Sequence, residues 1–174
     1  SHNSQWALQV ALVVSRHFET ELTLLVAEGG KGADHEWLTR AREQLLTATV
    51  GTLRDVTQPG SAEEAILAES AAQTYDLILL APAGRRGLSR LLHGSRVAQV
   101  VRQSNTSVLV ARAPLTDIRR MMVSVGGTRQ SLEMVEVAAH WAQALGARAT
   151  ILHVVSQLPL FFQGLTAGEG HHTT

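Results

Sequence analysis

The stretch from Tyr75 to Arg112 constrains the fold most, because it places two apolar runs, at 76–81 and 107–111, around a glycine-bearing loop and a helix pattern. Short continuous apolar runs are typical of strands covered on both faces of a parallel sheet. A loop that leaves the carboxyl end of such a strand and enters a helix offers free backbone N–H groups, and the helix dipole there favours an anion. The stretch therefore predicts an α/β fold with a phosphate-bearing ligand at this loop.

The loop itself contains Gly84 and Gly94, and Ser95 is a good N-cap for the helix that follows. The simpler interpretation is a flexible loop that ends in a capping serine. The basic character of the loop suits an anionic ligand, although exposed arginines near a helix start are often only solvated. These basic residues are Arg85, Arg86, Arg90, His93 and Arg96.

The spacing of Gly84, Gly94 and Ser95, with LSRLLHGS before the helix and SVLVAR after it, resembles the universal stress protein family. Nucleotide-binding members of that family carry G-x2-G-x9-G-[S/T] here. The resemblance implies that ATP, with or without Mg²⁺, is bound with its phosphates at these three residues, and that the backbone at Ala27 meets the adenine. Ala81 stands where the family's first glycine is expected, and its Cβ crowds a close backbone approach.

The rest of the chain predicts alternating helices and strands. Ser61 and Glu64 form a capping box that opens one of these helices. The order predicts a doubly wound open parallel sheet, similar through the resemblance to the adenine nucleotide alpha hydrolase-like fold, in which the opening repeat lacks its first strand. The expected elements are a helix over 5–18, a strand over 21–27, a helix from Asp34, a strand over 52–56, the helix after Ser61, a strand over 76–81, the helix after Ser95 and a strand over 107–111.

A second, partial repeat follows, because 118–125, 131–145 and 149–155 show a strand, helix and strand pattern again. We expect a universal stress protein-like domain at 4–113, the first half of a second repeat at 114–156 and a flexible tail at 157–174. Gly126 stands where the family has the aspartate of V-D-G-S, and the resemblance places it near the ligand. A plain strand-to-helix turn is the simpler interpretation of Gly126 to Thr128, and a likeness to the SGGxDS loop of adenylating enzymes is weak.

A sheet without its middle strand leaves two rows of backbone groups unpaired. We expect the strand over Met121–Val125 to fill this position, from the same molecule or from a neighbouring one by exchange. The alternative is that the chain is a fragment of a longer tandem protein.

The composition argues against several classes of partner and of functional site. The chain has 15 basic and 15 acidic residues, so its net charge of zero predicts neither a nucleic-acid partner nor an anionic membrane surface. It has no cysteine, which excludes thiol catalysis and thiolate metal sites and agrees with a cytoplasmic location. No nucleophile elbow, HExxH or Walker A motif occurs, and the histidines lack metal-ligand spacing, so neither a catalytic residue nor a metal ligand is predicted.

Three functions remain open. The first is a module that binds an adenine nucleotide in a stress-response or regulatory role without efficient catalysis. The second is a dimerisation or regulatory module that has lost the ligand and pairs through Ser107 to Ala111 as a homodimer or pseudo-dimer, either alone or within a larger protein such as a transporter. The third is an adenylating enzyme. The candidate ligand-binding residues are Ala27, Ala81, Gly84, Arg85, Gly94, Ser95, Arg96 and Gly126.

Overall fold

The computed structural model describes residues 4–29, 35–48, 51–82, 96–126 and 128–153. Its contacts divide the chain into two units, Ser1–Ile118 (unit 1) and Arg119–Thr174 (unit 2). Within the described ranges, no helix has both the length and the apolar character that a bilayer crossing requires.

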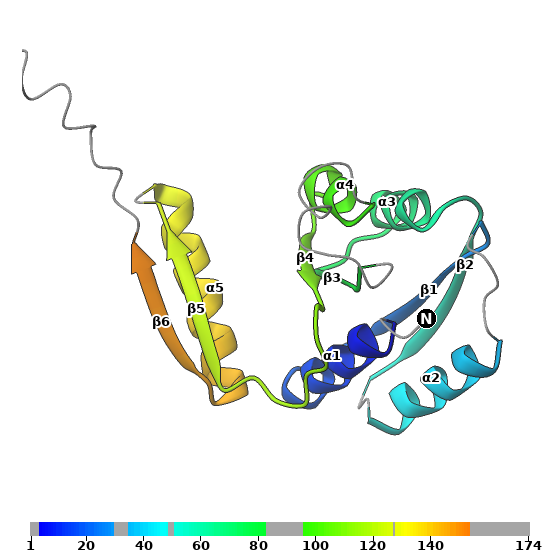
Figure 1. Ribbon diagram of the computed structural model, residues 1–174, viewed down its shortest axis with the longest axis horizontal. Coiled ribbons are helices and arrows are strands. Elements are labelled where there is room, and N and C mark those ends of the chain that lie inside the picture. Colours follow the sequence, from blue (N-terminus) through cyan, green and yellow to red (C-terminus); the bar gives the residue numbers. More distant parts are fainter. Residues whose placement is uncertain (1–3, 30–34, 49–50, 83–95, 127, 154–174) are drawn as a thin grey trace, which may run out of the picture. The chain divides into compact units, whose positions relative to one another are not determined.

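Unit 1 alternates helices and strands in the order that the sequence predicts (Figure 1). The described residues of unit 2 form one strand, helix and strand. The elements of unit 1 are α1 (Ser4–His17), β1 (Leu22–Ala27), α2 (His35–Ala48), β2 (Leu53–Gln58), α3 (Ala62–Ala72), β3 (Leu77–Leu80), α4 (Arg96–Gln103) and β4 (Ser107–Val110); those of unit 2 are β5 (Arg120–Val125), α5 (Arg129–Leu145) and β6 (Arg148–His153).

All described strand pairs are parallel. In unit 1, β1 pairs with β2 from Leu22 opposite Leu53 to Ala27 opposite Gln58. β3 pairs with β4, with Leu80 opposite Val110 at its end. Parallel pairs joined through helices confirm the predicted α/β class. Among the described residues, β1 and β3 are not paired with each other.

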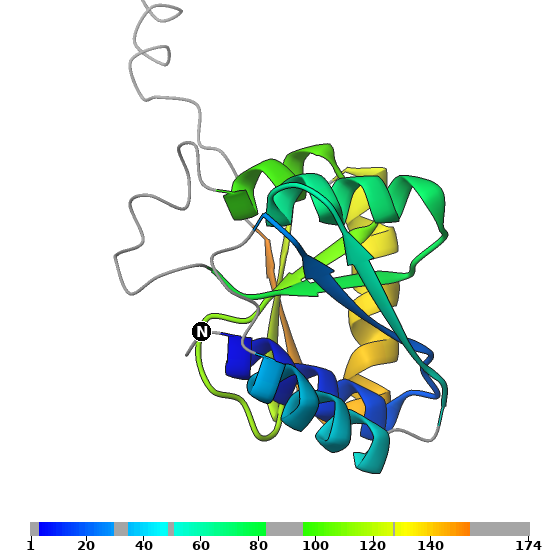
Figure 2. The same cartoon turned by 90° about the vertical axis from the view of Figure 1, so that its right-hand side faces the viewer.

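The helices of unit 1 form two layers around its strands. Helices α1 and α2 lie together on one face, and α3 and α4 lie together on the other (Figures 1 and 2). Burial follows this arrangement, because the apolar stripe of each helix faces the strands. The buried apolar side chains of unit 1 are Val10, Val13, Val14, Ala41, Leu45, Ala65, Leu80, Val100 and Ala111.

Helix α3 begins as the sequence predicts. The Ser61 side chain accepts a hydrogen bond from the Glu64 backbone N–H, and the Glu64 carboxylate accepts one from the Ser61 N–H at 2.8 Å. Both groups satisfy N–H donors that a helix start leaves unpaired. The predicted capping box is therefore confirmed.

In unit 2, β5 pairs in parallel with β6, and Met122 lies opposite Thr150. β5, α5 and β6 form a strand, helix and strand crossover, so this pairing joins strands that are neighbours in sequence and needs no long connection. That Met121–Val125 fills the middle of the sheet, from the same molecule or from a neighbouring one, stays a prediction.

Candidate functional site

Two of the predicted ligand-binding residues lie at the carboxyl ends of strands that border one cleft. Ala27 is the last residue of β1, and Ala81 follows Leu80 at the end of β3. Both line a cleft of about 990 Å³ within unit 1, which we call the β1–β3 cleft. The carboxyl ends of parallel strands are where α/β sheets bind ligands. The structure thus brings Ala27 and Ala81 to the borders of one hollow.

The loop between β3 and α4 lies outside the described residues, and so do Gly84, Arg85, Gly94 and Ser95. The structure describes the chain on either side of it. The loop begins after Pro82, and Arg96 is the first residue of α4. The side chain of Arg96 is not among the described ones. The predicted role of these five residues remains a prediction.

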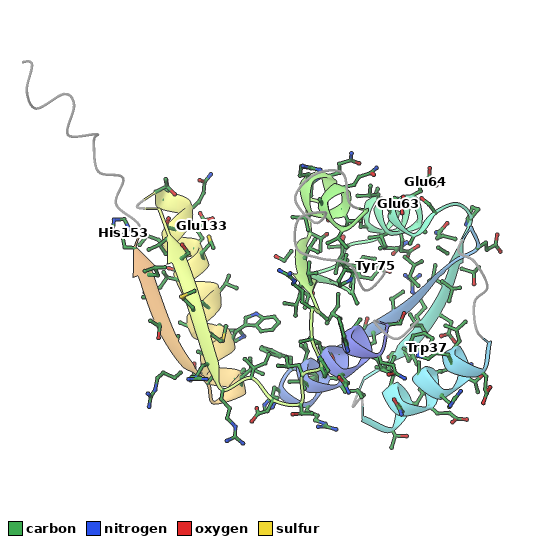
Figure 3. The ribbon with its side chains drawn as sticks, in the orientation of Figure 1. Trp37, Glu63, Glu64, Tyr75, Glu133 and His153 are labelled. Atoms are coloured by element: carbon green, nitrogen blue, oxygen red, sulfur yellow. The ribbon has the colours of Figure 1, made fainter. Side chains whose placement is uncertain are left out.

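The helix starts of unit 1 differ in charge. The first turn of α3 contains Glu63 and Glu64, and that of α2 contains Glu36, whereas the first turn of α4 has no acidic residue. Hydrogen bonds from the Ser61 backbone and hydroxyl hold the pKa of Glu64 below its usual value, so this carboxylate stays ionised (Figure 3). A carboxylate thus already occupies the amino end of α3, while α4 begins with Arg96. Of these three helix starts, α4 best suits an anion.

Next to Ala27, the ends of β1 and β2 are held together through their backbones. The Gly29 N–H donates to the Gly60 carbonyl at 2.8 Å, and the Glu28 N–H donates to the Gln58 carbonyl at 2.9 Å. A Cβ on Gly29 would lie 2.4 Å from the Gly60 oxygen, and Gly60 has a φ of 90°, so both positions favour glycine. The sequence did not predict this contact between the two glycines.

A buried carboxylate forms a second feature of the cleft that sequence reasoning missed. Glu69 of α3 is only 6% exposed. It accepts hydrogen bonds from the Tyr75 hydroxyl at 2.7 Å and from Arg54 at 2.6 Å on one oxygen, and from the Gln58 amide at 3.0 Å on the other. Figure 3 labels Tyr75, which lies just before β3.

Hydrogen bonds from Tyr75, then from Gln58, lower the pKa of Glu69, and Arg54 adds to this effect against burial, which raises it. A buried charge is tolerated only when it is paired and hydrogen-bonded, and these partners meet that condition. Because Arg54 and Gln58 belong to β2 and Tyr75 precedes β3, the network joins α3 to β2 and to the segment that leads into β3. Its geometry is that of a structural ion pair in the wall of the cleft.

Gly126 belongs to unit 2, where it follows β5. Its backbone N–H donates to the Ser131 hydroxyl at 3.2 Å, and the Thr128 N–H donates to the same oxygen at 3.3 Å. A Cβ on Gly126 would meet no atom within 4 Å. Two amides that a phosphate would use are therefore already bonded, which agrees with the simpler interpretation of a strand-to-helix turn.

The described residues contain no group of three or more histidine, cysteine, aspartate or glutamate side chains that could hold a metal ion.

Three solved structures show the same fold. A universal stress protein from Archaeoglobus fulgidus DSM 4304 is 18% identical with a TM-score of 0.70, over 96% of this chain and 69% of that one. The universal stress protein UspA from Lactobacillus plantarum is 21% identical with a TM-score of 0.52, over 64% and 91%. A universal stress protein in complex with cAMP is 21% identical with a TM-score of 0.51, over 61% and 84%.

A search of curated proteins gave no match. The family model described as "Universal stress protein family" matches residues 2–112. This range includes β1 to β4 and the β1–β3 cleft between them. Since it spans well over half of the 174 residues, the chain belongs to the universal stress protein family.

Proposed function

We propose that unit 1 binds an adenine nucleotide, ATP in particular, in a regulatory or stress-response role in the cytoplasm and without efficient turnover. One observation carries the proposal: the part of the chain that matches the family places the ends of β1 and β3 on one cleft, directly before the loop that leads to α4. The similar structure solved with cAMP supports an adenine nucleotide as the ligand class.

In the proposed complex, the backbone at Ala27 faces the adenine. The phosphates lie at the start of α4, where Gly84, Gly94 and Ser95 supply amides and a hydroxyl, and Arg85 and Arg96 supply positive charge. The lack of acidic residues in the first turn of α4 supports this end of the cleft for the phosphates. Mg²⁺ would enter with the triphosphate.

Isothermal titration with ATP and Mg²⁺ tests the proposal, and a colorimetric phosphate assay on the same samples tests the lack of turnover. We expect saturable heat and little phosphate release. The absence of heat at millimolar nucleotide would contradict binding. Titration with GTP and cAMP in parallel establishes whether the base or the triphosphate dominates recognition.

Ala81 offers the sharpest variants, because it borders the cleft and is partly exposed. Ala81→Asp should weaken ATP binding at least about tenfold, since a carboxylate there repels the phosphates. Ala81→Gly should strengthen binding by removing the Cβ. Ala72→Asp is the matched control, because it introduces the same charge at the exposed, far end of α3. If Ala81→Asp and Ala72→Asp bind equally, the site is elsewhere.

The position of β4 supports a second candidate, a module that pairs through 107–111. Among the described strands, β4 pairs with β3 alone, so one edge of Ser107–Val110 has no described partner strand. Such an edge can add a strand from another copy. The double variant Val108→Lys and Val110→Lys should lower the sedimentation coefficient of a dimer, with Thr57→Lys on β2 as the control. An unchanged sedimentation profile, with an unchanged circular dichroism spectrum, would argue against this pairing.

A further inference from the structure

In unit 2, one face of the strand pair is covered unevenly. Val123 of β5 lies opposite Ile151 of β6, and residues opposite each other in a parallel pair point to the same face. Val123 is 8% exposed, on the strand against which α5 packs, whereas Ile151 is 57% exposed. Within the described residues, α5 therefore covers this face over β5 and leaves it open over β6.

One side of α5 is apolar as well. Leu132, Val135 and Ala139 recur at spacings of three and four residues, so they share one side of the helix. Val135 is half-buried, while Leu132 is 67% exposed and Ala139 is exposed too. These three residues and Ile151 of β6 form what we call the α5–β6 strip.

The equivalent part of unit 1 shows which segment belongs on this strip. Aligning the repeat ALQVALVVSRHF with VEVAAHWAQALG places Val135 and Ala139 at the positions of Ala7 and Ala11 in α1. Ala7 and Ala11 line the same hollow as β1 and the apolar residues of α2, and α1 packs against α2. In unit 1, the segment that follows β1 thus returns along this side of α1. The segment that follows β6 is its equivalent in unit 2.

The residues after β6 have the composition and the reach for this position. Strand β6 ends at His153, and positions 158–162 read LPLFF, a run of apolar residues without a charge. His153 and Glu133 of α5 lie at the same end of unit 2 (Figure 3). The residues at 154–157 span at most about 14 Å when extended, so the apolar run can turn back over Leu132 and Ile151.

We propose that the segment 158–162 folds back over the α5–β6 strip of the same molecule and docks its leucine and phenylalanine side chains there. The driving force is the removal of apolar surface from water on both partners. The short connection favours docking within one molecule, because it keeps the segment close to the strip at any protein concentration.

Thiol accessibility tests the docking, because the chain has no natural cysteine. Ile151→Cys and Thr150→Cys are each placed in the full chain, with and without the pair Phe161→Asp and Phe162→Asp, and alkylation by a small maleimide is timed. Thr150 is the matched control, since it neighbours Ile151 on the opposite face of β6.

We expect the two aspartates to speed alkylation at position 151 at least about fivefold, because they keep the segment off the strip, and to leave the rate at position 150 unchanged. Equal rates at position 151 in the two backgrounds would overturn the proposal. So would an equal acceleration at position 150, because docking on one face cannot protect the other.

A variant on α5 tests the other partner of the contact. Leu132→Lys places an ammonium group on the strip, at a side chain that is exposed in α5 itself, so the circular dichroism spectrum should stay unchanged. It should accelerate alkylation of the Ile151→Cys thiol as the two aspartates do. Glu133→Lys, next to it on α5, is the control and should have no effect. If Leu132→Lys leaves the rate unchanged, the segment does not dock on this strip.

Protein concentration separates docking within one molecule from capture by a second copy. The rate at position 151 should be the same over a wide range of concentration. Protection that appears only at high concentration would overturn docking within one molecule. These measurements need no nucleotide, so their failure is distinguishable from a failure of ATP binding.

Discussion

Two segments of the chain have the same helix, turn and strand pattern, yet they differ in burial. Helix α1 buries Val10, Val13 and Val14, and β1 is partly buried at every residue. In the matching segment, α5 leaves Leu132 and Val137 exposed, and β6 is exposed at every residue. The difference shows that a periodic pattern determines which element forms, whereas neighbouring elements determine what that element buries. Unit 1 supplies such neighbours, whereas the part of unit 2 that the structure describes is one strand, helix and strand crossover.

The largest expected effect comes from comparing a charged residue introduced on α1 with one introduced on α5. Val13→Asp places a carboxylate where the side chain is 3% exposed, and it should cost about 3–5 kcal/mol of unfolding free energy. Val137→Asp, at a position 59% exposed, should change that free energy by no more than about 0.5 kcal/mol. Urea unfolding followed by circular dichroism measures both. Equal costs would show that the outer face of α5 is covered and would contradict the difference in burial between α1 and α5.

The next largest effect concerns two glycines that follow strands, Gly29 in unit 1 and Gly126 in unit 2. Gly29→Ala brings a Cβ to 2.4 Å from the Gly60 carbonyl oxygen, a backbone atom that moves only with its turn. We expect a cost of about 1–3 kcal/mol, in the range of overpacked sites. Gly126→Ala meets no atom within 4 Å and should be tolerated. Thermal unfolding of the two variants compares them directly, and a neutral Gly29→Ala would mean that the two turns separate easily.

The buried network of Glu69 predicts a pH dependence located in unit 1. Because its pKa is lowered in the folded state, Glu69 adds stability above its unfolded value of about 4.5, and that stability is lost as the pH falls through the folded pKa. Glu69→Gln should therefore cost about 1–2 kcal/mol near neutral pH. In this variant, the unfolding free energy should also fall less steeply than in the parent as the pH is lowered.

Urea midpoints measured from pH 7 downward test this slope. Glu133→Gln removes an exposed carboxyl group from α5 and serves as the control. If the parent and Glu69→Gln lose stability in parallel as the pH falls, the network does not determine the acid response.

The smallest expected effect, the stability cost of removing a serine at a helix start, should be equal in the two units. Ser61→Ala removes the cap of α3, and Ser131→Ala removes the hydroxyl that accepts the amides of Gly126 and Thr128 at the start of α5. Each should cost about 1 kcal/mol, since capping depends on a few adjacent residues and not on the burial of the helix. A much larger cost for either serine would indicate a tertiary role for its turn.

Local signals in the sequence predicted the local structure. The alternation of apolar runs and helix stripes gave the order from α1 to β6, and Ser61 with Glu64 predicted the start of α3, because these interactions involve residues close in sequence. The predicted first and last residues of the elements were less accurate than their order. The predicted helix from Ser131 begins at Arg129, because the turn after β5 ends at Thr128.

Interactions between distant residues could not be predicted in the same way. Nothing near Glu69 in the sequence indicates that Arg54, Gln58 and Tyr75 surround it, since they come from two other segments. The pairing of β5 with β6 could not be predicted for the same reason, because an apolar strand pattern does not specify its partner. The sequence placed Ala27 and Ala81 at strand ends, and the structure adds that both border one cleft. Their role in ligand binding stays a prediction.

The backbone bond between Gly29 and Gly60 has a consequence for how this rim can change. It fixes the register of the residues just after β1 against the turn after β2. An insertion between Ala27 and Gly29, or between Gln58 and Gly60, would break this bond, so a new loop joined to β1 at this end is better attached after Gly29.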